Sequence, residues 1–312
     1  MFKCPNNRMT KSPNDQMYNA TVLAHAYEAC EALARSHYEN FPVASALLPR
    51  PMRPHIAAVY AFARTADDLA DEGNAPGTAR RAALDAWQRR LHVAVASASW
   101  SPDGTKEDLI LAAVAASIRA LNLPLPLFDD LISAFAQDTM TNRYASWADV
   151  FDYCRRSANP VGRLVLRIAG YRDEALDQSS DALCTALQLT NFWQDFGRDW
   201  RAGRLYVPRD VQCATGADEA QLGGGTLTGS WVRALEQCID VTRERFAEGR
   251  AVCDGVRGRL RAELRFTWLG GSRILDRVER GRFALVERRP TLRLADLPLL
   301  TWRALVWRPA RT

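Results

Sequence analysis

The sequence predicts an all-α protein, and three observations support this prediction. Apolar residues recur at helical spacing almost throughout the chain, and no series of alternating strands is found. No GxGxxG motif follows a strand, so a dinucleotide-binding domain is not expected. The 312 residues are 47% hydrophobic and 25% charged, which allows a large core and excludes global disorder. We therefore expect one helical domain over residues 17–312, preceded by a flexible N-terminal segment over residues 1–16.

Proline and glycine divide the chain into helical blocks. The first block presents a regular apolar face that includes Ala26 and Cys30. Pro51 and Pro54 suit the first turn of a second helix, which continues through Arg64. Further breakers stand at residues 73–77, 101–104, 124–126, 160, 208 and 223–226. Each of them marks the expected boundary of another helix.

The chain carries no signal for export or for crossing a membrane. Residues 109–118 form its longest central run without charge or proline, and ten residues are too few to span a bilayer. Residues 1–16 mix charged and polar side chains and lack the apolar stretch of a signal peptide. Seven scattered cysteines form no CxxC pair, which argues against a disulfide framework or a zinc site. We expect a cytoplasmic protein with reduced cysteines.

Positive charge is concentrated at the C-terminal end. The net charge is +5, yet residues 250–312 contain 15 arginines and six acids. Such a surplus suits nucleic acid, an anionic membrane or an anionic substrate, and a solvated helix face is the alternative. No zinc finger or RNP-like strand accompanies it, so we expect no nucleic-acid partner. Trp302, Leu305, Val306 and Trp307 suggest a peripheral contact with anionic lipid, with a helix packed on the core as the alternative.

The first candidate site is an acidic cluster on a predicted helix. Asp67 and Asp71 lie one turn apart on the same face, where like charges repel each other. A bound divalent cation such as Mg²⁺ would favour this arrangement, because it takes carboxylate, water and phosphate oxygens. A solvated acidic helix end is the alternative, since Glu72 continues the run and Gly73 ends it.

The second candidate site is a polar stripe on an otherwise apolar helix. Asn191, Asp195 and Asp199 follow one another at intervals of four residues, while Phe192 and Trp193 cover the other sides. Such a helix is most simply buried with its stripe facing a cavity. If the two clusters face each other, they can hold Mg²⁺ ions around a diphosphate and assist ionisation of a carbon–oxygen bond.

Two arginines lie beside these clusters. Arg64 precedes the first cluster by one turn, and Arg204 follows the second. A guanidinium can bind phosphate oxygens with two hydrogen bonds. We expect both to contact a diphosphate, although a single arginine is more often a surface residue.

The motifs together resemble the squalene/phytoene synthase family. The resemblance spans about residues 20–285 in consistent order and is carried by residues 41–50 (FPVASALLPR), 64–72 (RTADDLADE), 153–162 (YCRRSANPVG), 191–199 (NFWQDFGRD) and 204–208 (RLYVP). It implies an isoprenoid synthase helical fold with a central active-site cavity. It implies Mg²⁺, with Mn²⁺ as a substitute, on Asp67, Asp71, Asn191, Asp195 and Asp199. It further implies diphosphate binding by Arg64, Arg204 and Tyr206, and catalytic roles for Tyr153 and Gln194.

Details of the motifs are similar to one subgroup, the hydroxysqualene synthases of bacterial hopanoid biosynthesis. Family members that condense two prenyl diphosphates usually have a basic residue where this chain has Gln194, and Arg198 replaces a usual acid. The subgroup converts presqualene diphosphate and water to hydroxysqualene without a nicotinamide. Its pathway partners are a presqualene diphosphate synthase and a hydroxysqualene reductase.

Two alternatives remain open at this point. The first is a squalene or phytoene synthase that joins two prenyl diphosphates head to head. The second is a non-catalytic helical relative, which we would expect to have lost acids from the two clusters. Both clusters keep all their acids here, which favours an enzyme.

Overall fold

The computed structural model describes residues 13–36, 47–71, 75–97 and 104–307. Helices account for the regular structure of these residues, and no strand occurs among them. The α-helices are α1 (Pro13–Ser36), α3 (Arg53–Asp71), α4 (Gly77–Ala96), α5 (Lys106–Leu121), α6 (Pro126–Asp138), α7 (Trp147–Ser157), α8 (Asn159–Ile168), α9 (Glu174–Gln194), α10 (Phe196–Arg201), α11 (Arg209–Thr215), α12 (Gly229–Glu248), α13 (Val252–Gly255), α14 (Gly258–Gly281) and α15 (Leu297–Leu305). Short 3₁₀ turns are η2 (Arg50–Met52), η3 (Glu219–Gly223), η4 (Arg282–Ala284) and η5 (Leu294–Asp296). The all-α prediction is confirmed.

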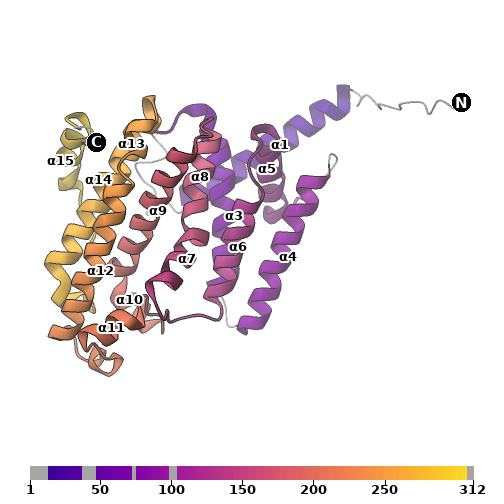
Figure 1. Ribbon diagram of the computed structural model, residues 1–312. Helices are drawn as coiled ribbons and strands as arrows, with labels where there is room; N and C mark the ends of the chain where they lie inside the picture. The colour runs from indigo at the N-terminus through magenta and orange to yellow at the C-terminus, as the bar shows by residue number, and fades with distance from the viewer. Residues whose placement is uncertain (1–12, 37–46, 72–74, 98–103, 308–312) are drawn as a thin grey trace, which may run out of the picture.

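The long helices stand side by side, with α4 at one edge and α14 and α15 at the other (Figure 1). The short helices α10 and α11 lie together at the lower end of this view. Helix α9 packs against α7, α8, α12 and α14, so it runs through the interior. Trp193 of α9 is fully buried, and its indole N–H donates to the Thr242 hydroxyl of α12 at 2.8 Å. A central helix in this position buries its apolar sides at Phe192 and Trp193, while the predicted polar stripe stays accessible.

Helix ends follow local sequence signals. The Thr105 hydroxyl accepts from the backbone N–H of Asp108 at the start of α5, and Asp173 similarly caps α9. Asn122 ends α5 in the left-handed conformation, with φ of 49°. Pro160 stands in the first turn of α8 and separates this helix from α7, as the sequence predicted. Residues 13–16 of the expected flexible segment form the first turn of α1, and residues 1–12 lie outside the described ones.

One hydrophobic core extends from Ala26 on α1 to Val286 beyond α14. The described cysteines are free: Cys30, Cys154, Cys184, Cys213, Cys238 and Cys253. In the described parts of the chain, no helix is both long and apolar enough to cross a membrane.

Helix α15 is attached to the outer side of α14. Leu300 and Ala304 are buried against Leu269 of α14. Trp307 packs edge-on against Trp268, with 5.4 Å between the ring centroids, and its indole N–H donates to Asp254 at 3.0 Å. The C-terminal helix therefore packs on the body through one face, as the alternative in the sequence analysis held, and Trp307 turns inward.

Candidate active site

The first wall of the site is the end of α3. Asp67 and Asp71 occupy successive turns, and their side chains are about 40% exposed. Arg64 lies one turn earlier and pairs with Asp67 at 3.2 Å and with Asp68 at 2.5 Å. Burial raises the pKa of Asp67, and the charge of Asp71 raises it further. The first wall is therefore a half-buried acidic surface in which the Arg64 guanidinium pairs with two of the carboxylates.

The second wall is the junction of α9 and α10. The sequence predicts a continuous helix here, but α9 ends at Gln194 and Asp195 adopts φ −96° and ψ 10° before α10 begins. The ladder of backbone bonds continues across the break: Asp195 N–H donates to Asn191 C=O at 2.8 Å, and Asp199 N–H to Asp195 C=O at 2.9 Å. The three stripe residues therefore remain on one face. Asn191 is exposed, and Asp195 and Asp199 are half-buried.

Arg204 joins the two walls. Gly203 adopts a φ of 81°, which glycine tolerates, and the chain reverses there after α10. The Arg204 N–H then donates to the carbonyl of Asp199 at 2.7 Å, and its guanidinium reaches Asp71 at 2.5 Å. The ion pair spans 133 positions of sequence. The two acidic clusters are thus neighbours in space.

A further carboxylate, Asp138, belongs to the same region and was missed by the sequence analysis. It ends α6 and accepts a hydrogen bond from the Tyr153 hydroxyl at 2.7 Å. Burial raises the pKa of Asp138 to about 7, the charges of Asp71 and Asp67 add to this, and Arg204 opposes it. No repeat or acidic neighbour marks this residue in the sequence, so only the fold reveals it.

Aromatic rings line the region between the walls. Phe192 and Tyr206 are stacked in parallel, 3.7 Å between centroids, and Tyr153 lies about 6 Å from both. Tyr144 packs against Tyr153 and Tyr206. All four side chains are buried, and burial raises the pKa values of the three tyrosines. The faces of such rings attract positive charge.

A third guanidinium, which the sequence analysis missed, comes from the segment after α14. Arg289 makes two hydrogen bonds to Asp195, one of them 3.2 Å from Nη2 to Oδ2. These residues are 94 positions apart. Asp195 therefore carries an arginine partner on the second wall, as Asp71 does on the first.

Residues 285–290 are held against the α9–α10 junction by several contacts. Gln194 is 5% exposed, and its side-chain amide donates to the Pro290 carbonyl at 2.6 Å. The Arg201 guanidinium donates to the Val286 carbonyl at 2.8 Å. Gly197 lies so near that a Cβ there would be 2.1 Å from the Val286 oxygen. Gln194 thus contacts the 285–290 segment, whereas its expected catalytic role stays a prediction.

The electrostatics of the second wall resemble those of the first. Burial raises the pKa of Asp199 to about 7, with a further contribution from Asp195, and Arg204 and Arg198 oppose it. The charge of Asp195 acts on Asp199 in this way because the two carboxylates lie one helical turn apart. Arg198, the departure from the family pattern, is exposed and lies 3.9 Å from Asp195.

The donors of both walls are oxygens, which suits Mg²⁺ chemically. In the described part of the chain, however, no three His, Cys, Asp or Glu side chains come close enough together to hold a single ion. The acids are instead spread over two walls and paired with Arg64, Arg204 and Arg289. A Mg²⁺ ion held by these acids would need further oxygen ligands from outside the described side chains, such as water or a diphosphate.

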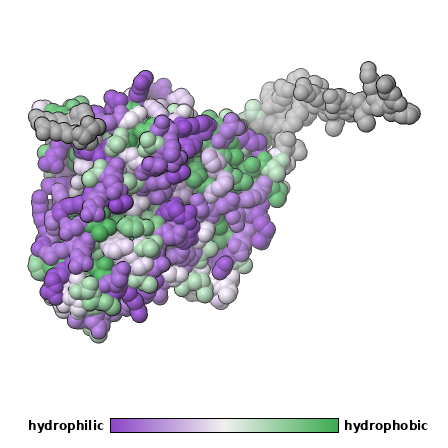
Figure 2. All heavy atoms as spheres, viewed as in Figure 1, coloured by the Kyte–Doolittle hydropathy of each residue, from purple (hydrophilic) through white to green (hydrophobic). Residues whose placement is uncertain are grey.

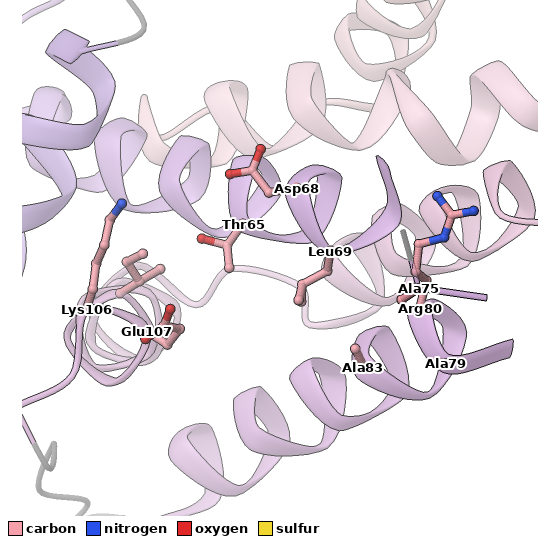
Figure 3. A pocket seen from close by; sticks show the side chains of 10 residues that line it. Thr65, Asp68, Leu69, Ala75, Ala79, Arg80, Ala83, Lys106 and Glu107 are labelled. Atoms are coloured by element: carbon pink, nitrogen blue, oxygen red, sulfur yellow. The ribbon is translucent and has the colours of Figure 1, made fainter. Parts of the chain in front are cut away.

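A pocket of about 410 Å³ lies on another face of α3 (Figure 3). Thr65, Asp68 and Leu69 of α3 line it together with residues of α4 and α5, among them Arg80 and Lys106. Asp67, Asp71 and Arg204 are not among its lining residues. This pocket is therefore distinct from the expected central cavity between the acidic walls. Residues 41–46 of the opening motif lie outside the described residues.

Comparison with known proteins identifies close relatives. A hydroxysqualene synthase from Zymomonas mobilis is 39% identical over 186 residues, which is 59% of this chain and 60% of that protein. One from Rhodopseudomonas palustris is 36% identical over 213 residues, 68% of this chain and 69% of that protein. A 15-cis-phytoene synthase from Synechococcus elongatus is 29% identical over 304 residues, 91% of this chain and 95% of that protein.

The solved structures that resemble this chain include squalene and dehydrosqualene synthases. The squalene synthase HpnC from Alicyclobacillus acidocaldarius shares 40% identity, with a TM-score of 0.76 over 83% of this chain and 94% of that one. A dehydrosqualene synthase in complex with ligand shares 19% identity and has the same fold, with a TM-score of 0.80 over 93% and 98% of the two chains. The family model for squalene/phytoene synthase matches residues 34–296. The chain belongs to the squalene/phytoene synthase family and has the isoprenoid synthase helical fold.

Proposed function

We propose that this enzyme is a hydroxysqualene synthase, which converts presqualene diphosphate and water to hydroxysqualene and diphosphate. The observation that supports it best is the pair of acidic walls joined by Arg204, with arginine partners on Asp71 and Asp195. Such a site suits a departing diphosphate. The identity of 36–39% to hydroxysqualene synthases favours this subgroup.

Binding of the diphosphate is assigned to three arginines. Arg64 and Arg204 flank the acidic walls, and Arg289 adds a third guanidinium from the C-terminal side. We propose Mg²⁺, or Mn²⁺ in its place, on Asp67, Asp71, Asn191, Asp195 and Asp199. When bound, the cations would neutralise the leaving group. Arg204 and Arg289 would then turn from their carboxylates towards phosphate oxygens.

The reaction needs no oxidant or reductant. The bond between carbon and the diphosphate oxygen breaks, and the leaving group keeps the electron pair. The cyclopropylcarbinyl cation rearranges, a water oxygen bonds to carbon, and the water gives up one proton. A nicotinamide is therefore not required.

We propose that the aromatic side chains stabilise the cation formed in this reaction. Tyr153, Phe192 and Tyr206 present ring faces that stabilise positive charge. Asp138 holds the Tyr153 hydroxyl at 2.7 Å, which fixes the orientation of that ring. Buried rings also exclude bulk water, which would otherwise capture the cation early.

The chemistry of substrate and product implies neighbours in a reaction sequence. One enzyme must supply presqualene diphosphate, and a reductase must consume hydroxysqualene. We propose that the enzyme works beside both in the cytoplasm, a location that free cysteines suit.

The deciding experiment gives purified enzyme and Mg²⁺ either presqualene diphosphate or farnesyl diphosphate and identifies the products. We expect hydroxysqualene from presqualene diphosphate and no product from farnesyl diphosphate. Asp195→Ala should reduce diphosphate release at least 100-fold, since it removes a carboxylate of the second wall. Condensation of farnesyl diphosphate by the unaltered enzyme would contradict the proposal.

The second candidate is a head-to-head synthase, favoured by 29% identity to a phytoene synthase over nearly the whole chain. Gln194→Arg tests which residue separates the two activities. If the missing charge at position 194 sets the substrate, the variant should gain some farnesyl diphosphate condensation. An unchanged product would show that Gln194 is not the discriminator.

A further inference from the structure

The outer face of the C-terminal region is unusually apolar for a protein surface. Eleven large hydrophobic side chains are exposed in the described chain, and seven of them fall within residues 292–306. These are Leu292, Leu294, Leu297, Leu299, Trp302, Leu305 and Val306. Leu294 is 85% exposed, Leu305 75% and Trp302 61%. Clusters of this kind mark interaction surfaces, whereas single exposed hydrophobics do not.

These exposed side chains belong to a segment that is packed tightly against the body of the protein through its other face. The inner face of α15 buries Leu300 and Ala304, and Trp307 lies with its ring 3.9 Å below the Arg250 guanidinium. Before α15, the buried Asp296 pairs with Arg277 at 2.7 Å and Arg273 at 3.3 Å. With the inner face fixed in this way, the residues on the opposite face must point outward.

Apart from Leu297, the exposed hydrophobic residues of α15 lie on one side of the helix, together with the adjoining Val306. Leu299, Trp302 and Val306 follow one another at intervals of three and four residues, and Leu305 adjoins them. Figure 1 places α15 at the outer edge of the bundle. The face of the bundle seen in Figure 2 is mainly hydrophilic, with scattered hydrophobic residues. We call the exposed surface formed by residues 292–306 the α15 face.

The charges around the α15 face are positive. Within residues 292–306, Arg293 and Arg303 are exposed and Asp296 is the only acid. The exposed Glu287 and Arg288 that precede this segment offset each other in charge. Asp296 is 4% exposed and already carries two arginine partners. On the neighbouring α13, Asp254 pairs with Arg265 at 3.1 Å. The surface therefore combines exposed apolar side chains with uncompensated positive charge, and this combination complements an anionic lipid bilayer.

We propose that the α15 face docks the enzyme on anionic membrane surfaces, with Leu294, Trp302 and Leu305 inserted among the lipids and Arg293 and Arg303 on the headgroups. Tryptophan suits this boundary because its ring is apolar and its N–H is polar. The inference stands apart from the proposed reaction, because binding is measured without substrate.

The test is sedimentation of the full chain with vesicles of phosphatidylcholine, with and without phosphatidylglycerol. We expect strong binding only to the anionic vesicles, and release at high salt. Leu294→Ser/Trp302→Ser/Leu305→Ser should weaken binding at least tenfold. Val93→Ser/Met140→Ser is the matched control, because these side chains are 59% and 65% exposed elsewhere. Circular dichroism melts check that both variants fold.

The charge contribution is tested separately. Arg293→Gln/Arg303→Gln should weaken binding about 25-fold, since each arginine near an anionic surface contributes roughly fivefold. Arg259→Gln, an exposed arginine on α14, should have little effect.

Two results would overturn the proposal: absence of vesicle binding by the unaltered chain, and equal binding by the triple variant and its control. Absence of vesicle binding can be accompanied by a dimer that the triple variant dissociates. Such a dimer would assign the α15 face to a second copy of the chain.

Discussion

Arg289 and Asp195 form an ion pair that links the C-terminal part of the chain to the second acidic wall. The adjacent arginine, Arg288, is exposed and makes no ion pair that the structure records. Nothing in the local sequence distinguishes these two arginines. Their difference arises because the 285–290 segment is fixed against the α9–α10 junction, which brings the Arg289 side chain, itself 41% exposed, to Asp195.

Substitutions at Arg289 test its proposed role, and the same substitution at the neighbouring Arg288 serves as the control. Arg289→Gln should lower kcat/KM by about 10–100-fold, because a charged hydrogen-bond donor to the diphosphate is lost. Arg289→Lys should recover only part of this, since an ammonium cannot make two parallel contacts. Arg288→Gln should change kcat/KM by less than about twofold. Steady-state kinetics on presqualene diphosphate give all three values, and equal losses for positions 288 and 289 would contradict the assignment.

The sequence allowed part of the site to be predicted. Asp67, Asp71, Asn191, Asp195 and Asp199 stand at regular helical intervals, so their grouping on two faces follows from helix geometry. Asp138 and Arg289 are isolated residues, and Gln194 contacts a carbonyl 96 positions away. Contacts of this type depend on how helices pack, and no local pattern encodes them.

At the scale of elements, the breakers located the helices well. Pro160 and the residues around positions 49–54 and 124–126 stand at helix boundaries, as expected. The interruption at Asp195 was not predicted, because residues 188–199 contain no proline and their one glycine lies beyond the break. At that junction, Gln194 and Arg201 contact residues 285–290, which lie far away in the sequence, so no local pattern predicts the break.

Helix α14 contains a buried carboxyl group that predicts a pH dependence. Glu263 is 6% exposed, and its Oε2 has no hydrogen-bond partner. Burial raises its pKa to about 7. Because the folded-state pKa lies above the unfolded value near 4.3, the folded protein binds this proton more tightly. The contribution of this group to stability is complete below about pH 4 and is lost as the pH rises through 7.

Glu263→Gln isolates this effect. The variant should be more stable than the unaltered protein at pH 8 by up to about 3.5 kcal/mol, at about 1.4 kcal/mol for each unit of pKa difference, and the difference should vanish near pH 4. Urea unfolding at several pH values measures it. Glu28→Gln, at an exposed position of α1, serves as the control and should show no such pH dependence. A constant difference across the pH range would show that Glu263 does not titrate on unfolding.

At the scale of the whole molecule, the site depends on segments from most of the chain. Its residues come from α3, α6, α7, the α9–α10 junction and the segment after α14. The family match over residues 34–296 agrees with such a distributed site. A ligand that contacts both acidic walls should therefore stabilise the whole folded protein against unfolding.

Thermal unfolding tests this coupling. Mg²⁺ and inorganic diphosphate together should raise Tm by about 5 °C at 100-fold saturation, because binding to the folded state alone adds about 2.7 kcal/mol. Either component alone should give a much smaller shift. Asp71→Asn/Asp195→Asn should abolish the joint shift, since it changes one carboxylate on each wall. Asp240→Asn, an exposed aspartate on α12, is the control. A full shift with Mg²⁺ alone would contradict the coupling.

The arginine partners of Asp71 and Asp195 also bear on how rigid the enzyme is. Each guanidinium neutralises a carboxylate before any ligand arrives, so the resting protein does not have to spread its helices to relieve repulsion. The two carboxylates are thus held at fixed positions by side chains alone, and a ligand that draws either arginine away has to move only that long side chain.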